Sequence, residues 1–345
     1  MSFKPITYRK KHLTLHKTII NPDFNARIVL ASDPWEYVDM WLKRRGKTGV
    51  RFFWQQARSF YNASLSLSKY SVPLTAYYSM LNMTKALLTV KGVQFSDEHH
   101  GLSGKNTSTK ALLSKEVVEF KTTGVLPGLC RYLQEPSDCL KYTLKNVLYN
   151  LPYIHRAYCL TFSSDPELFV PITKPLFVKK EGSSETWFCA DIKNRKYRNI
   201  WTVRSLPYDF EKEEAPDSNT EFTIRCRRRF KWTGANKASL GRLCNYHKRI
   251  RKHLLYINGP QCLWYIKRTG NNNGIIERST LTLQFAAMHR LSELTRYEPL
   301  ILTKHFRGKH NWLLSEFITK TLDQYVDEIS AEITGAQIMI PGIRS

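Results

Sequence analysis

The sequence predicts an α+β protein in which a mostly helical bundle is split by a β-rich insert. Two patterns support this fold. In the first and last thirds of the chain, apolar residues recur at three- and four-residue spacing, as on amphipathic helices. In the middle, β-branched and aromatic runs are separated by Pro, Gly and Ser, as in a sheet. We therefore expect a basic N-terminal arm at 1–30, bundle segments at 31–154 and 271–345, and a basic β-rich insert at 155–270.

The first bundle segment is expected to contain three helices. Apolar spacing indicates helices at 35–42 and 52–67. The clearest helix begins at Pro73, whose fixed φ suits a first turn, and ends where Gly92 follows a basic last turn. Apolar residues cover most of its circumference, so it should be buried on several sides, as in a bundle.

The insert is expected to form a sheet. Strands are predicted at 157–162, 175–179, 186–192, 199–203 and 221–232. In the last of these, EFTIRCRRRFKW, apolar and basic residues take opposite parities. Since side chains alternate between the two faces of a strand, four cations should project from one face: Arg225, Arg227, Arg229 and Lys231. The next segment, 239–256, has the pattern of an amphipathic helix.

Helix is expected again in the last bundle segment. Apolar stripes indicate one helix at 279–295, with Pro299 as a stop, and another at about 312–332. Helices therefore flank the predicted sheet on both sides in the sequence.

The charge of the chain indicates a polyanionic partner. Lys and Arg number 53 against 29 Asp and Glu, which leaves a formal net charge of +24. Such a chain attracts nucleic acid or an anionic membrane surface. We favour nucleic acid and expect no membrane partner, because no apolar run of about 18 residues and no signal-like N-terminal core occurs. A cytoplasmic location is expected. The seven cysteines are scattered without a C-x-x-C pair that would suggest a zinc site or a disulfide framework. We expect no metal and no other cofactor.

The predicted nucleic-acid interface is the cationic strand and the segment after it. Cations on one strand face repel each other unless a polyanion or acidic neighbours offset them, and acidic residues are scarce nearby in the sequence. The alternative is a solvated sheet face. The predicted contacts to phosphate are Arg225, Arg227, Arg229, Lys231, Lys237, Lys248, Arg249, Arg251 and Lys252. Nearby aromatic residues either stack on bases or belong to the core: Trp187, Tyr197, Trp201, Trp232 and Trp264.

Several segments resemble known families. AYYSMLNMTKALLTVKG at 76–92, followed by HHGLSG at 99–104, resembles the helix of HEPN domains, with their aromatic pair, glycine and histidine-glycine pair. Together with Ala57-Arg58-x-Phe60 and LSELTRYEP at 291–299, these segments are similar to the YaaC-like family. The resemblance implies a HEPN-like helical bundle, a homodimer formed through it, and a partner protein in a defence system. Many HEPN proteins are ribonucleases, so it also implies an RNA-targeting effector in toxin or antiviral defence.

The resemblance further implies a candidate catalytic pair. HEPN ribonucleases act without metal through an R-x(4–6)-H pair, in which His transfers a proton and Arg stabilises the charge on phosphorus. Arg242 and His247 fit this spacing, as do Arg9 and His16. Composition alone should give roughly two such matches by chance, so the spacing is weak support. The predicted catalytic pair is Arg242 and His247.

Two other functions stay open. The chain is alternatively a non-catalytic interaction module that dimerises or recruits a partner enzyme. The weaker alternative is a metal-dependent nuclease, because Asp191-Ile-Lys193 closes a predicted strand and Glu185 or Asp165 would supply the second carboxylate. His99 and His100 lie beside acidic residues, but a polar loop that caps the bundle explains them more simply.

Overall fold

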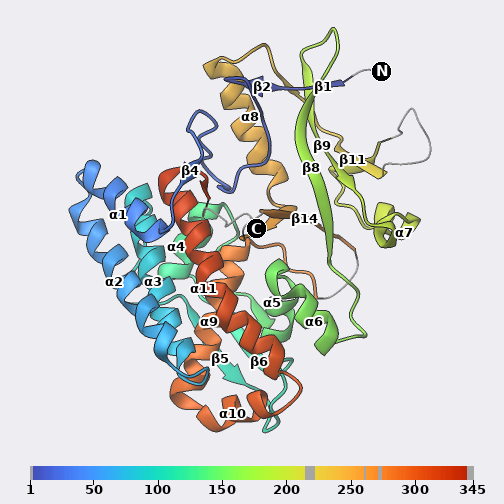
Figure 1. The fold of residues 1–345 in the computed structure, drawn as a ribbon. Coiled ribbons are helices and arrows are strands. Elements are labelled where there is room, and N and C mark those ends of the chain that lie inside the picture. Colours follow the sequence, from blue (N-terminus) through green and yellow to red (C-terminus); the bar gives the residue numbers. More distant parts are fainter. Residues whose placement is uncertain (1–2, 214–221, 260–261, 271–273, 340–345) are drawn as a thin grey trace. The chain divides into compact units, whose positions relative to one another are not determined.

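The computed structural model describes residues 3–213, 222–259, 262–270 and 274–339. It forms two compact units, and Figure 1 labels most of their helices and many of their strands. Unit 1 comprises Met1–Val29, Glu167–Asn273 and Gly335–Gln337; unit 2 comprises Leu30–Pro166, Gly274–Thr334 and Ile338–Ser345.

Unit 2 is mainly helical, with a small antiparallel sheet. Its central helix is α3 (Val72–Lys91), which packs against α2, α9 and α11 and is buried along most of its length. Gly92 ends α3 in the left-handed conformation, with φ 67°. The other helices are α1 (Pro34–Arg44), α2 (Thr48–Ser66), α4 (Val125–Leu133), α5 (Leu144–Tyr149), α6 (His155–Thr161), α9 (Thr280–Tyr297), α10 (Pro299–Arg307) and α11 (Asn311–Thr334), with a 3-10 turn at Pro152–Ile154. The sheet joins β5 (Leu102–Asn106), β6 (Glu116–Phe120) and β7 (Lys141–Thr143).

Unit 1 is built on an eight-stranded antiparallel sheet. Six strands follow the order β10-β11-β9-β8-β14-β13, while β1 pairs with β8 and β12 pairs with β9. The strands are β1 (Phe3–Pro5), β8 (Phe169–Lys180), β9 (Glu185–Ile192), β10 (Phe210–Lys212), β11 (Phe222–Cys226), β12 (Phe230–Lys231), β13 (Leu254–Ile257) and β14 (Leu263–Lys267). The remaining elements of unit 1 are β2 (Thr7–Tyr8), β3 (Lys11–His12), a 3-10 turn at Arg195–Tyr197, α7 (Ile200–Arg204) and α8 (Lys237–Ile250). A separate two-stranded sheet pairs β4 (Val29–Leu30) with β15 (Ile338–Met339), which belongs to unit 2.

The core of unit 1 lies between the sheet and α8. Leu243, Tyr246 and Ile250 of α8 are buried in one apolar cluster with strand residues such as Phe177 and Phe188. Residues 3–15, which the sequence suggested as part of a basic arm, lie in this unit: β1 pairs with β8, and Ile6, Leu13 and Leu15 are buried in the same cluster.

The prediction of a mostly helical bundle is wrong. Helix accounts for 46% of the chain and strand for 20%. The fold is therefore α+β, with a large eight-stranded antiparallel sheet in addition to the helices. The HEPN-like bundle implied by the resemblance is likewise not shown. The sequence indicated strands in the middle of the chain, but local periodicity does not show that β1, near the N-terminus, and β14 both pair with β8, which enlarges the sheet to eight strands.

Two predicted strands are helices, and one is interrupted. Residues 157–162 lie mostly in α6, and 199–203 lie mostly in α7, where the side chain of Asn199 caps the helix by accepting from the Thr202 N–H at 2.8 Å. Runs of five or six residues are too short for periodicity to separate helix from strand. The predicted strand 221–232 is divided into β11 and β12 by residues 227–229, and Glu221 lies outside the described residues. The helices predicted at 35–42, 52–67, 279–295 and 312–332 are confirmed.

A buried charge network holds β6, α9 and α10 together within unit 2. Arg290 donates to Glu116 at 3.1 and 2.7 Å and to Glu298 at 2.8 Å. On the other side of Glu116, its Oε1 lies 3.2 Å from His305 Nε2, and His305 in turn lies 3.0 Å from His310. Glu116 and Arg290 have almost no contact with solvent. These groups therefore depend on one another for their hydrogen bonds.

No helix among the described residues combines the length and apolar character needed to cross a bilayer.

Candidate nucleic-acid interface

The excess positive charge of the chain is concentrated in unit 1. This unit contains 28 of the 53 Lys and Arg residues but only 11 of the 29 Asp and Glu residues, so its formal charge is +17. The remaining 25 basic and 18 acidic residues leave +7 on unit 2, which is the larger of the two. The electrostatic attraction for a polyanion therefore arises mainly from the sheet unit.

The cationic strand keeps its alternation, although it is not one continuous strand. Phe222, Ile224 and Cys226 of β11 are buried, as are Phe230 and Trp232 after the break. The basic side chains between them face solvent to different degrees. We call Arg225, Arg227, Arg228 and Arg229 the arginine ladder; their side chains are 32%, 53%, 52% and 49% exposed, respectively.

Every member of the arginine ladder has an acidic neighbour from another segment. Arg225 and Arg227 contact the two carboxylate oxygens of Glu211 at 2.9 and 3.0 Å. Arg228 pairs with Asp209 at 2.9 Å, and Arg229 pairs with Glu185 at 2.6 Å. Glu211 lies opposite Arg225 in the register of β10 with β11. The sequence argument that acidic groups are scarce here is therefore wrong, because strand pairing supplies them.

These ion pairs are exposed enough to exchange partners. A solvent-exposed Arg–carboxylate pair contributes roughly 0–1 kcal/mol, since water and salt screen it. A phosphate group accepts the same charge-assisted hydrogen bonds from a guanidinium. The carboxylates offset the mutual repulsion of the ladder in the free protein, and they leave its guanidinium groups accessible.

The other predicted phosphate contacts are mostly on the surface. Lys231, Lys237, Arg249 and Lys252 are exposed, and Lys248 is half-buried. Arg251 differs, because it is only 3% exposed. Its guanidinium donates to the backbone carbonyls of His16 and Lys17 at 3.1 and 2.9 Å, which ties the N-terminal segment to the end of α8. Arg251 thus has a structural task, and its position does not favour a phosphate contact.

The predicted catalytic pair does not converge on an open site. Arg242 donates to the Lys231 carbonyl at 2.7 Å and to Ser239 Oγ at 3.0 Å. His247 is completely buried, and its Nε2 accepts from the backbone N–H of His16 at 3.0 Å. Burial, reinforced by Arg251, holds the pKa of His247 well below its usual value. Five positions along a helix separate side chains by roughly 140° around its axis. Catalysis by this pair stays a prediction that the geometry does not favour.

The aromatic residues named from the sequence divide between core and surface. Trp187, Trp232 and Trp264 are buried, whereas Trp201 is 50% exposed. Tyr197 is half-buried, and its hydroxyl donates to Glu167 at 2.8 Å. Trp201 is therefore the aromatic residue of this set that is best placed to meet a ligand.

Trp201 belongs to an exposed segment that the sequence reasoning missed. We call residues 193–208 the aromatic–cation segment. Trp201 lies on α7 with the guanidinium of Arg268 3.7 Å from its ring centroid, and Tyr208, 87% exposed, lies 5.9 Å from that of Arg227. Lys193, Arg195 and Arg204 of the same segment are exposed. The capping Asn199 was the available signal, because it places Ile200–Arg204 in a helix on the surface rather than in a strand.

The metal-dependent alternative finds no assembled ligand set. Asp191 accepts from Thr223 Oγ1 at 3.0 Å and lies 3.4 Å from Lys174 Nζ. Glu185 is paired with Arg229, and Asp165 with Lys145 and Tyr158. In the described parts of the chain, no group of three or more His, Cys, Asp or Glu side chains is arranged to hold a metal ion.

Comparison with known protein families gives a match over most of the chain. The family model described as YaaC-like Protein matches residues 24–333, which covers parts of both units. No curated protein and no solved structure matches the chain.

Proposed function

The chain belongs to the YaaC-like family, and we propose that it binds single-stranded nucleic acid, RNA in preference to DNA, through unit 1. The binding surface combines the arginine ladder with the aromatic–cation segment. The observation that carries this proposal is the exposed indole of Trp201 amid cations, in the unit that holds +17 of the net charge.

The charge supports a polyanionic ligand. Each basic side chain that contacts a phosphate releases condensed counterions, so affinity depends on how many cations reach the backbone. The exposed cations of the arginine ladder, Arg249 of α8 and Lys252 just after this helix are available for such contacts. This attraction does not distinguish one sequence from another, because phosphate contacts position a protein without reading bases.

The aromatic groups support a single strand over a duplex. The bases of a single strand are free to stack on an exposed ring, and such stacking contributes roughly 1–3 kcal/mol per base. Trp201 and Tyr208 offer exposed rings, each with a guanidinium close to its face. The preference for RNA rests on the resemblance to HEPN ribonucleases.

We further propose that this binding serves an effector in toxin or antiviral defence in the cytoplasm, with a homodimer or a partner protein completing the assembly. This role rests on the resemblance alone. A non-catalytic module that recruits a partner enzyme is the preferred form of the proposal, because His247 is buried and its Nε2 already accepts a backbone hydrogen bond.

The test is a titration of the purified protein with a fluorescent single-stranded RNA of about 20 nucleotides, read by anisotropy. Trp201→Ala is expected to weaken binding by about 5- to 100-fold, as the loss of one stacked base predicts. Trp312→Ala is the matched control, because Trp312 is equally exposed, at 49%, but lies on α11 of unit 2. Equal affinities for the two variants would contradict the proposed interface. Single-stranded DNA and duplex RNA of the same sequence then test the two preferences.

A further inference from the structure

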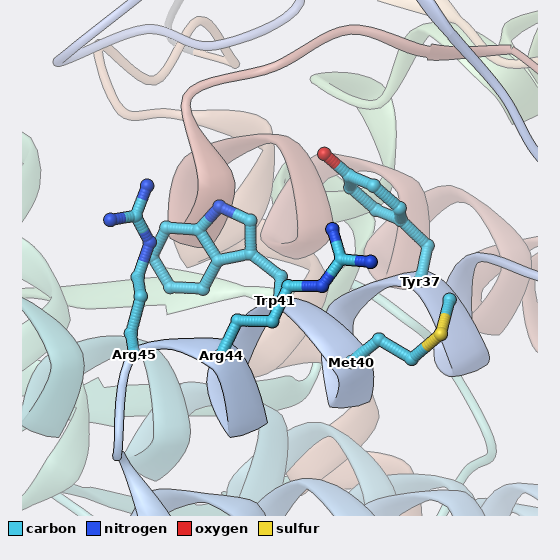
Figure 2. A pocket seen from close by; sticks show the side chains of 5 residues that line it. All are labelled: Tyr37, Met40, Trp41, Arg44 and Arg45. Carbon is cyan, nitrogen blue, oxygen red and sulfur yellow. The ribbon is translucent and has the colours of Figure 1, made fainter.

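Helix α1 of unit 2 carries two stripes of large side chains. Trp35, Val38 and Leu42 form the buried stripe. The second stripe follows the spacing i, i+3, i+4, i+7, i+8, which also brings side chains together along one side of a helix. Its members are only half-buried or exposed, and they line a pocket of about 300 Å³: Tyr37, Met40, Trp41, Arg44 and Arg45. Figure 2 shows these five side chains rising from α1 and the residue that follows it.

The pocket combines aromatic faces with guanidinium groups. The guanidinium carbon of Arg45 lies 4.1 Å from the ring centroid of Trp41, which is a cation–π contact. In the view of Figure 2, the guanidinium of Arg44 lies between the rings of Trp41 and Tyr37. Burial raises the pKa of the Tyr37 hydroxyl, and the positive charges of Arg45 and Arg44 oppose that shift. Both arginines therefore act electrostatically on the same small space.

The acidic residues of this helix are engaged elsewhere. Asp39 accepts from Arg51 at 2.8 and 3.1 Å. Asp33, the N-cap, and Glu36 are both bound by Arg58. Arg44 and Arg45 form no salt bridge within the part of the chain that the structure describes, in contrast to every member of the arginine ladder. Two neighbouring guanidinium groups without a carboxylate favour a ligand that brings negative charge.

We propose that this pocket binds a nucleoside monophosphate group, either as a free nucleotide or as the 5′ end of a strand. The base stacks beside Trp41 and Tyr37, and the phosphate receives charge-assisted hydrogen bonds from Arg44 and Arg45. A guanidinium fork matches the geometry of a phosphate, and the pocket volume lies at the lower end of the range for small-molecule sites. An acidic peptide would use the cations but would leave the aromatic faces without a planar partner. The site lies in unit 2 and does not rest on the function proposed for unit 1.

The experiment measures binding of AMP, adenosine and inorganic phosphate to the full chain by calorimetry. AMP is expected to bind at least tenfold more tightly than either adenosine or phosphate, since only AMP engages both the rings and the arginines. The double variant Arg44→Gln/Arg45→Gln and the variant Trp41→Ala should each weaken AMP at least tenfold, while Trp41→Phe retains most of the affinity. Lys43→Ala is the control, because Lys43 is exposed on the same helix but does not line the pocket.

Several outcomes would overturn the proposal. These are failure of AMP to bind at millimolar concentration, equal binding by the double variant, or tighter binding of an acidic peptide that the same variants abolish. Because the replaced side chains are at least partly exposed, thermal unfolding should show that each variant folds. The unit 1 interface is tested separately, by RNA binding of Trp201→Ala, so failure here is distinguishable from failure of that interface. A 5′-phosphorylated trinucleotide that binds as tightly as AMP assigns the pocket to strand ends, and one that binds tenfold more weakly assigns it to free nucleotides.

Discussion

Arginine and carboxylate side chains pair in both units, but their surroundings are opposite. In unit 2, the side chains of Arg290 and Glu116 are 2% and 0% exposed. In unit 1, the side chains of the arginine ladder are between 32% and 53% exposed. Water does not reach the buried pair to replace a lost partner, so this pair serves to stabilise the fold. Breaking an exposed pair costs little free energy, so the arginine is available to pair with a ligand instead.

The largest effect is expected from breaking the buried pair. Arg290→Ala leaves Glu116 as a buried charge and removes the hydrogen bond to Glu298, so it should lower the free energy of unfolding by about 3–5 kcal/mol. Chemical denaturation measures this value. The matched variant in unit 1 is Arg229→Ala, for which we expect a loss of about 1 kcal/mol or less. Similar losses in both variants would remove the contrast between the two regions.

Acid should also destabilise unit 2, because this unit buries a neutral histidine. Burial lowers the pKa of His289 to about 3, with further lowering from His100, Arg290 and Arg296, while Glu293 lies 3.7 Å away. The unfolded chain takes up this proton near pH 6.5, and the folded chain does not until about pH 3. Folding is therefore favoured above pH 6.5 and loses stability as the pH falls from there toward 3.

His289→Phe removes this proton uptake. Between about pH 6.5 and 4.5, the free energy of unfolding should fall by roughly 2 kcal/mol more in the unchanged protein than in this variant. Parallel pH curves for the unchanged protein and His289→Phe would show that His289 does not titrate in this way.

The arginine ladder should affect binding more than stability. The triple variant Arg225→Ala/Arg227→Ala/Arg229→Ala is expected to change the free energy of unfolding by about 1–2 kcal/mol at most, and to reduce the slope of log affinity for single-stranded RNA against log salt by up to about 2. The control removes three exposed lysines from unit 2, Lys105, Lys110 and Lys115, and so changes the net charge equally. An unaltered slope in the arginine variant would exclude the ladder from the interface.

The smallest effect is expected at the predicted catalytic pair. If the protein cleaves RNA in EDTA, Arg242→Ala should change the rate by less than about twofold, because its guanidinium is occupied by hydrogen bonds to the end of β12 and to α8 itself. Loss of cleavage in this variant, with binding retained, would instead restore the metal-independent ribonuclease prediction for Arg242 and His247.

The sequence by itself determined the features that depend on neighbouring residues. The helices around Pro73 and from Ser279 onward follow from apolar spacing and caps, and the alternation from Phe222 to Cys226 follows from the two-residue period of a strand. The net charge also follows from composition alone. These properties depend only on neighbouring residues or on composition, so they can be predicted from the sequence.

Only the tertiary structure decided which of those residues contact each other and which are exposed to solvent. Strand pairing placed Glu211 opposite Arg225. The side chains of Arg251 and His247 form hydrogen bonds with the buried backbone of the N-terminal segment. The turn of α7 left Trp201 on the surface, while Trp187 and Trp232 went to the core. The first two of these outcomes depend on partners 14 to 235 residues away in the sequence. The sequence does not show whether the side chain of an arginine or a tryptophan is buried or exposed. Its burial determines how much its contacts contribute to stability and to binding.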